Sequence, residues 1–224
     1  MKSTSRSRKK PKQEQIISII NGTSAASGTG YVTGTFDGLK KILSGSDTEY
    51  TSAVDISTSA LMDSNYNAYL DELDGFISKL AEKPDILLMN NELLTKTRAA
   101  ARRAGFYERS VDGFGRTVEK YNGIPMMDVG QYYNGTKTVD VIETTTPSAT
   151  AYGETAIYAA KLGLNAFHGI SVDGSKMVHT YLPDLNAPGA VKKGEVEMLA
   201  GAVLKNSKMA GVLKGIKVKP KTAG

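Results

Sequence analysis

The chain has 224 residues, enough to bury a sizeable core as one large domain or as two small domains that share strands. It contains no cysteine, which excludes disulfide scaffolds, thiolate zinc sites and cysteine nucleophiles. The basic N-terminus is followed by no apolar run of signal-peptide length, and no segment approaches the ~20 apolar residues of a membrane span. We therefore expect a soluble protein without a membrane partner.

The net charge of +5 is distributed unevenly along the chain. Residues 1–14 hold six basic residues and one acidic residue, and residues 205–224 hold six lysines and no acidic residue. Residues 15–204 hold the other 16 basic and 22 acidic residues, a net charge of −6. We expect basic disordered tails at residues 1–14 and 219–224, mostly solvated but also suited to contact with phosphates or acidic surfaces.

The first predicted elements are short. An apolar run at residues 16–20 ends at Asn21-Gly22 and leads into a loop rich in glycine, serine and threonine. Residues 36–43 form a short amphipathic segment. The next segment, up to the first long helix, is expected to be irregular and extended.

A long helix is predicted from Asp63, its expected N-cap, to Leu80. Its apolar residues recur at three- and four-residue steps and form one continuous stripe. Such a stripe is typical of a helix that packs on a core. We expect no cofactor there.

A short buried strand is predicted at residues 84–90, directly before a basic helix. Asn90 or Asn91 is the expected cap of this helix, and Gly105 stands where a left-handed C-terminal stop is favoured. Acidic Glu92 in the first turn also suits a helix N-terminus.

The basic helix raises the question of nucleic-acid binding. Its helical projection places small and apolar side chains on one face, among them Ala100 and Ala101. Arg98, Arg102 and Arg103 flank this face, whereas a helix that reads DNA gathers its basic residues on one exposed face. We predict that Ala100 and Ala101 pack against a partner element. The three arginines would then serve as end-of-helix charges and as salt-bridge donors between subunits.

The second half of the chain reads as strands and turns. Alternating residues on both sides of Asn122-Gly123 predict a hairpin. Residues 153–163 predict another strand, two short extended pieces surround Asp173-Gly174, and apolar residues continue up to about Val218. Helices and strands therefore occur in separate clusters, which indicates an α+β fold.

No motif in the sequence supports catalysis. The glycines of residues 28–34 match neither the dinucleotide fingerprint nor the phosphate loop, and "GISVDG" does not match a nucleophile elbow. Only His168 and His179 are available for a triad or a metal site, and no carboxylate accompanies them at metal-ligand spacing. We expect no enzyme activity, no metal and no cofactor.

Five segments occur in an order that resembles a known family. They are "FDGLKKIL" with "DISTSALMDSNYNAYLDELDGFISKL", "KPDILLMNNELLTKTRAAARRAGFYE", "DGFGRTVEKYNGIPMMDVG", "AYGETAIYAAKLGLNAFHGIS" and "VLKNSKMAGVLKGIKV". Together they resemble the major capsid proteins of tailed bacteriophages with the Hong Kong 97 type of fold. The resemblance covers residues 34–218.

The resemblance implies a peripheral domain with a long spine helix and a sheet, and an axial domain with helices around a central sheet. In this family an N-terminal arm and an extended loop precede the region that matches Phe36, so residues 13–20 would be the end of the spine helix. The implied division is a basic tail (1–14), the end of the spine helix with a peripheral segment (15–62), a mainly axial domain (63–190), a closing strand and helix segment (191–218) and a basic tail (219–224).

The resemblance also implies the function of a capsid subunit. Such a subunit forms pentamers and hexamers with itself, works with scaffold and portal proteins, and encloses DNA by non-specific electrostatic contact. It assembles in the bacterial cytoplasm and ends in the virion capsid. Two alternatives stay open: the shell protein of an encapsulin-like compartment and, from another class, a nucleic-acid-binding protein with basic tails.

Overall fold

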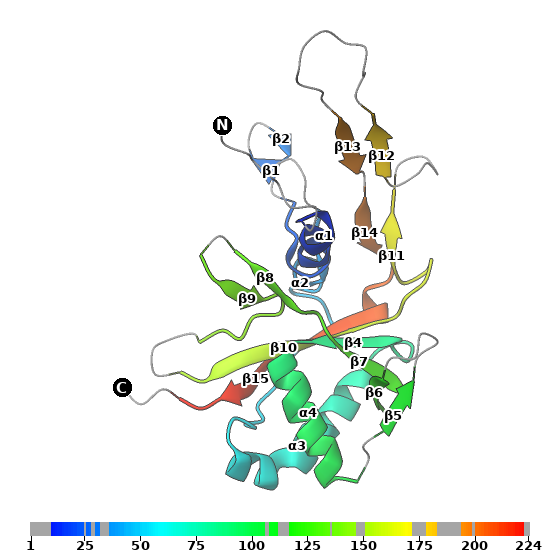
Figure 1. The fold of residues 1–224 in the computed structure, drawn as a ribbon. Helices are drawn as coiled ribbons and strands as arrows, with labels where there is room; N and C mark the ends of the chain where they lie inside the picture. Colours follow the sequence, from blue (N-terminus) through cyan, green and yellow to red (C-terminus); the bar gives the residue numbers. More distant parts are fainter. Residues whose placement is uncertain are drawn as a thin grey trace.

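A seven-stranded mixed sheet forms the centre of the computed structural model (Figure 1), with strand order β3-β15-β10-β4-β7-β6-β5. Its strands are β3 (Glu49–Thr51), β15 (Ala210–Lys219), β10 (Gly153–Ala160), β4 (Ile86–Met89), β7 (Ile124–Asp128), β6 (Thr117–Tyr121) and β5 (Glu108–Val111). The β3–β15 and β4–β7 pairs are parallel and the other pairs are antiparallel. The structure describes residues 10–24, 26–27, 30–31, 36–105, 108–111, 117–134, 136–146, 151–171, 178–182, 194–198 and 200–221.

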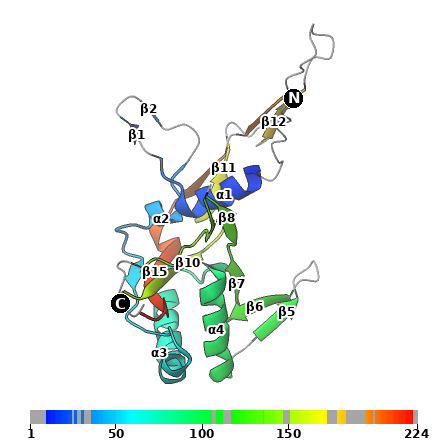
Figure 2. The ribbon, with the colours of Figure 1, turned by 60° about the vertical axis from the view of Figure 1, so that its left-hand side comes forward.

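Helices lie on both faces of this sheet, as Figures 1 and 2 show. Helices α3 (Ser59–Ser78) and α4 (Asn91–Arg103) cover one face, and α1 (Lys10–Asn21) and α2 (Leu39–Ile42) lie on the other. The two faces bury separate apolar cores. Strand alternation divides the side chains of β4 between them, with Leu87 and Met89 in the α3–α4 core and Ile86 and Leu88 toward the α1–α2 core. The expected α+β class is confirmed.

A bulge in β15 keeps Leu213 and Ile216 on the same face of the sheet. Opposite Thr155 and Ile157, two residues apart, stand Ile216 and Leu213, three residues apart. The bulged segment of β15 between Leu213 and Ile216 contains Gly215. The φ of Gly215 is 76°, in the left-handed region that favours glycine. Because of this one-residue insertion, Leu213 and Ile216 both reach the α3–α4 core although their spacing is odd.

Four short two-stranded ladders surround the sheet. They pair β1 (Ala26–Ser27) with β2 (Gly30–Tyr31), β8 (Gln131–Tyr133) with β9 (Thr138–Asp140), β11 (Phe167–Ile170) with β14 (Gly201–Leu204), and β12 (Val178–Tyr181) with β13 (Glu195–Met198). The last two ladders follow each other along one projection, which Figures 1 and 2 show pointing away from the sheet. We call the described residues from 162 to 204 the β-arm. A 3-10 turn, Ser207–Met209, joins it to β15.

Several predictions from the sequence are confirmed and others change. The buried strand, the basic helix, the hairpin at Asn122-Gly123 and a closing apolar strand are all present. Asp63 was wrong as the N-cap of the long helix, because α3 begins earlier and Thr58 accepts the capping hydrogen bond from the Leu61 N–H at 3.2 Å. Residues 22–34, expected to be a loop, contain the ladder β1–β2, and the other residues of 28–34 lie outside the described residues.

The expected tails overlap with regular structure at both ends. Helix α1 begins at Lys10, inside the segment 1–14, and β15 extends to Lys219. Residues 1–9 and 222–224 lie outside the described residues. Two lysines of the basic C-terminal stretch form ion pairs with the body of the protein: Lys214 with Glu49, and Lys219 with Glu92. The basic excess near the C-terminus is therefore partly neutralised by carboxylates of β3 and α4.

Candidate functional site

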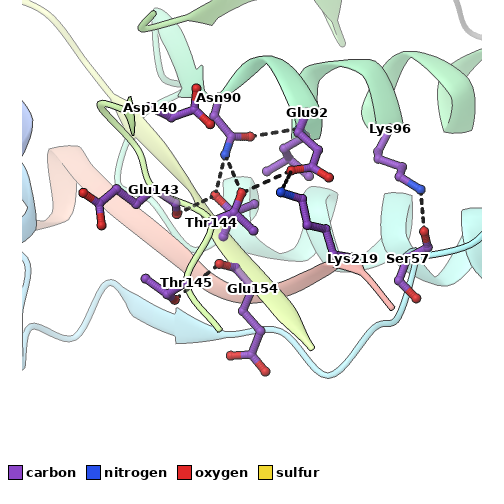
Figure 3. Close-up of polar contacts among 12 residues, drawn as sticks. Ser57, Asn90, Glu92, Lys96, Asp140, Glu143, Thr144, Thr145, Glu154 and Lys219 are labelled. Carbon is purple, nitrogen blue, oxygen red and sulfur yellow. Dashed lines mark hydrogen bonds and ion pairs between the residues drawn. The ribbon is translucent and has the colours of Figure 1, made fainter. Parts of the chain in front are cut away.

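The start of helix α4 is fixed by a buried asparagine (Figure 3). Asn90, 1% exposed, accepts a hydrogen bond from the Leu93 N–H through Oδ1 at 2.9 Å. Its Nδ2 lies 3.0 Å from the Ile142 carbonyl, 3.0 Å from Thr144 Oγ1 and 3.1 Å from Thr155 Oγ1. One side chain thus joins α4 to β10 and to the segment after β9. Because both ends of its amide are satisfied, its burial is favourable.

The same end of α4 is tied to the last strand. Glu92 Oε2 lies 3.3 Å from Lys219 Nζ and accepts a hydrogen bond from Thr144 Oγ1 at 3.3 Å. Figure 3 shows these groups side by side, with Lys96 further along the helix donating to the Ser57 carbonyl at 2.7 Å. The carboxylate also suits the positive end of the helix dipole. These contacts orient α4 relative to the sheet.

The small residues Ala100 and Ala101 of α4 are buried. Ala100 is 0% exposed and Ala101 is 1% exposed. In the middle of the helix, Thr97 Oγ1 meets the Tyr69 hydroxyl of α3 at 2.7 Å. Burial raises the pKa of the Tyr69 hydroxyl, so this group stays protonated and hydrogen-bonded. Because both alanines are fully buried, the packing around α4 leaves no room for larger side chains there.

Two of the three candidate arginines form ion pairs within the chain. Arg98 Nε lies 2.9 Å from both carboxylate oxygens of Glu119 on β6. Arg103 Nε lies 2.6 Å from Asp63 Oδ1 on α3. Arg102 is exposed in the last turn of the helix, and no ion pair of it is found among the described residues. Contact of any of them with a second subunit stays a prediction.

An open groove of about 900 Å³ lies beside α4. Leu94 and Arg98 line it from the helix, and strands β5, β6 and β7 contribute the rest. Its apolar residues include Val111 and Met127, which are 68% and 48% exposed. We call it the α4 groove. The groove was not predictable from the sequence, because its residues come from four elements that only the fold brings together.

The β-arm is the second exposed apolar surface. Of the ten exposed large apolar residues found in the described part of the chain, six lie on it: Leu162, Leu164, Ile170, Val178, Tyr181 and Leu182. A two-stranded ladder without a covering layer is marginally stable in water. Apolar patches of this kind mark contact surfaces. The extended pieces of the β-arm were predicted from the sequence, but their exposure was not, since periodicity alone does not say which face is covered.

A polar cleft of about 650 Å³ lies on the α1–α2 face of the sheet. Its floor holds the ion pair between Lys214 Nζ and Glu49 Oε1, at 2.7 Å. The hydrogen bond from Lys214, together with one from the Gly45 N–H, lowers the pKa of Glu49. Burial and the charge of Glu49 raise the pKa of Tyr158 to about 12. An ionised carboxylate and a protonated tyrosine beside a lysine suit electrostatic contact more than proton transfer.

His168 and His179, the two histidines of the chain, lie on β11 and β12 of the β-arm. Among the described residues, no group of three or more His, Asp or Glu side chains is placed to hold a metal ion. None of the described helices is both long enough and apolar enough to cross a membrane.

The structural comparison with known proteins identifies the fold. In sequence, the chain matches no family model and no curated protein. In structure, it is similar to the encapsulin SrpI of Synechococcus elongatus PCC 7942 in the cryo-EM structure of its holo complex, with a TM-score of 0.63 and 14% sequence identity. The match covers 95% of this chain, which spans 64% of the length of that encapsulin chain. The chain therefore has the fold of an encapsulin shell protein, which belongs to the Hong Kong 97 type of capsid fold.

Proposed function

We propose that this chain is a structural subunit that associates with itself into a closed protein shell of the encapsulin-like kind. The observation that carries the proposal is the match to an encapsulin along 95% of the chain. Since the chain spans 64% of the encapsulin's length, self-assembly of this chain is itself part of the proposal. Its affinity would be spread over broad contacts instead of being held in one pocket.

The exposed surfaces support self-association. The β-arm is a projecting ribbon with exposed apolar residues, and the α4 groove is a concave apolar surface elsewhere on the same chain. Closed rings and shells are built from contacts between two different surfaces of identical subunits. A chain with two such surfaces is suited to this type of contact.

The phage capsid of the sequence analysis becomes the second candidate. The similar structure is an encapsulin, which favours a protein-filled compartment in the bacterial cytoplasm. The second candidate is a virion capsid, which would need scaffold and portal proteins and would enclose DNA. In either case we propose that the chain is not an enzyme. The alternative from another class, nucleic-acid binding through the basic N-terminus, predicts an affinity that falls steeply with salt.

Assembly is tested with the purified chain by mass photometry and negative-stain electron microscopy. We expect rings or shells, and a strict monomer at high concentration under every salt condition would contradict the proposal. Leu164→Asp on the β-arm should reduce assembly. Its matched control is Asn165→Asp, which adds the same charge at the adjacent exposed position and should leave assembly in place.

The contents of the particles separate the two shell candidates. Particles from a bacterial lysate are treated with nuclease and then analysed for protein and for protected nucleic acid. A compartment should hold co-purifying protein, whereas a capsid should protect DNA. Replacing the lysines and arginines within residues 2–9 with serine should not change the particles. If this variant lost both assembly and DNA affinity, the result would favour the nucleic-acid-binding alternative.

A further inference from the structure

The sequence contains three Asn-Gly dipeptides, at residues 21–22, 122–123 and 134–135. In such a dipeptide the backbone nitrogen of glycine can attack the side-chain carboxamide of asparagine, because glycine has no Cβ to obstruct the approach. The attack needs a glycine N–H that is free to lose its proton and a carboxamide that is free to turn. The fold decides which of the three dipeptides meets both conditions.

The first dipeptide is held at both positions. Asn21 Nδ2 donates to the Val141 carbonyl at 2.5 Å, which fixes the carboxamide. The Gly22 N–H donates to the Ser18 carbonyl at 2.9 Å at the end of α1, and Gly22 is buried. Both groups would have to leave their partners before the reaction.

The third dipeptide is held through its side chain. Asn134 Oδ1 accepts hydrogen bonds from the Thr136 N–H at 3.0 Å and from the Lys137 N–H at 2.9 Å. The carboxamide is thus turned toward the residues that follow it. The backbone N–H of Asn134 also donates to the Lys137 carbonyl at 3.1 Å.

The second dipeptide is open. Asn122 and Gly123 form the two-residue turn between β6 and β7, with φ of 49° and 73°, and both are exposed. Among the described residues, neither the Asn122 carboxamide nor the Gly123 N–H has a hydrogen-bond partner. Lys83 Nζ lies 3.5 Å from the place that a Cβ of residue 123 would occupy, and its positive charge favours a deprotonated backbone nitrogen and a new carboxylate nearby.

We propose that Asn122 is a site of spontaneous deamidation. The Gly123 nitrogen, after losing its proton to water, forms a bond to the Asn122 side-chain carbonyl carbon, and the carbon–Nδ2 bond breaks with release of ammonia. Water then opens the resulting succinimide to aspartate or isoaspartate. The sequence of steps needs water only, with no oxidant or reductant.

The isoaspartate product would alter the sheet at a sensitive place. It adds one methylene group to the backbone of a two-residue turn whose flanking residues, Tyr121 and Ile124, are buried in the α3–α4 core. Strands β6 and β7 also line the α4 groove. Formation of isoaspartate in this turn would therefore weaken the pairing of β6 with β7 beside the α4 groove. The modification itself does not depend on the proposed shell function.

The test follows all three asparagines in the same sample. The full chain is incubated at mildly alkaline pH, digested, and analysed by mass spectrometry for deamidated and isoaspartyl peptides. Because the hydrogen bonds at the other two sites must break first, Asn122 should convert faster than Asn21 and Asn134 by about tenfold or more. Equal rates, or faster conversion of either guarded site, would overturn the proposal.

Two controls assign the difference to the fold. In denaturant the three dipeptides should convert at similar rates. If Asn122 still converted faster than the other two there, the neighbouring sequence and not the fold would set the difference, and the proposal would be overturned. Asn122→Gly keeps a residue that accepts positive φ in the turn and removes the carboxamide. In this variant the signal from the 122–123 peptide should disappear while the two guarded sites keep their rates.

Discussion

The central sheet and the β-arm are both built from strands, yet they differ in what covers them. In the sheet, β10 and β15 are covered by helices on both sides and most of their residues are buried. In the β-arm, the strands pair two by two and apolar side chains such as Leu164 and Leu182 are 77% and 84% exposed. The sheet is stabilised by its own two cores, whereas the apolar residues of the arm would need a partner surface for comparable burial.

This difference separates two kinds of mutational effect. A truncation in the sheet should lower the free energy of unfolding of the isolated chain. A truncation on the β-arm should leave that free energy nearly unchanged and weaken association with a second copy. The predictions below test this separation, beginning with the largest effect.

The first prediction compares two leucines. Leu213 on β15 is 1% exposed and Leu164 at the root of the β-arm is 77% exposed. Leu213→Ala should destabilise the chain by about 2–5 kcal/mol because it leaves a cavity in the core. Leu164→Ala should change the free energy of unfolding by about 0.5 kcal/mol or less. Urea unfolding of both variants measures the contrast, and similar losses would mean that the arm is part of the same cooperative core.

The second prediction concerns the buried cap of α4. Asn90→Ala should cost about 2–4 kcal/mol, because it removes the helix cap and leaves buried acceptors of β10 and of the segment after β9 without their donor. The adjacent exposed residue provides the control, and Asn91→Ala should be close to neutral. Thermal unfolding checks both variants. A similar shift for the two would show that the network around Asn90 adds little beyond the cap.

The same region shows how far the sequence could predict the structure. Helix α4, its asparagine cap and its left-handed stop at Gly105 follow from signals within about a dozen neighbouring residues, and these predictions are confirmed. The structure also buries Ala100 and Ala101. The partners of Asn90 lie 52 to 65 residues away in the sequence. No local pattern indicates them, since they depend on which strands become neighbours.

The candidate site was predictable to the same extent. The sequence indicated that the arginines of α4 flank a packing face, but Glu119 and Asp63 as the partners of Arg98 and Arg103 come from other elements. The misplaced cap at Asp63 has a similar cause, because Thr58 also has a capping side chain and the choice depends on where the preceding chain meets the sheet. The bulge at Gly215 could not be predicted either, because the local sequence does not distinguish this glycine from the other glycines of the chain.

The third prediction compares packing with charge on α4. Ala100→Leu should destabilise by about 1–3 kcal/mol, because a larger side chain has no space at a position that is 0% exposed. Arg98→Ala removes a partly exposed ion pair and should cost about 1 kcal/mol or less. Soluble yield and urea unfolding provide the comparison. A larger loss for Arg98→Ala would contradict the packing account of this helix.

The fourth prediction compares two glycines of the sheet body. Gly215→Ala should destabilise by about 1–2 kcal/mol, since its φ of 76° is left-handed and the new Cβ would lie 3.2 Å from Thr51 Cγ2. Gly75→Ala in α3 has open space within 4 Å and should stabilise by about 0.5–1 kcal/mol. Opposite signs in thermal unfolding are expected. A stabilising Gly215→Ala would show that the bulge is not needed to align β15 with β10.

The smallest effect is expected at the edge strand β3 of the sheet, where the side chains are only partly buried. Hydrogen bonds from Lys214 and from the Gly45 N–H lower the pKa of Glu49 below its ordinary value of 4.5. A lowered pKa in the folded state means that this carboxylate stabilises the fold at neutral pH, and that its contribution is lost as the pH falls below about the ordinary value. Because the pair is partly exposed, salt should reduce the effect further. Glu49→Gln should therefore lower the neutral-pH stability slightly and leave the acid-pH stability nearly unchanged, which flattens the acid limb of a plot of stability against pH. An unchanged acid limb would assign that limb to other carboxylates.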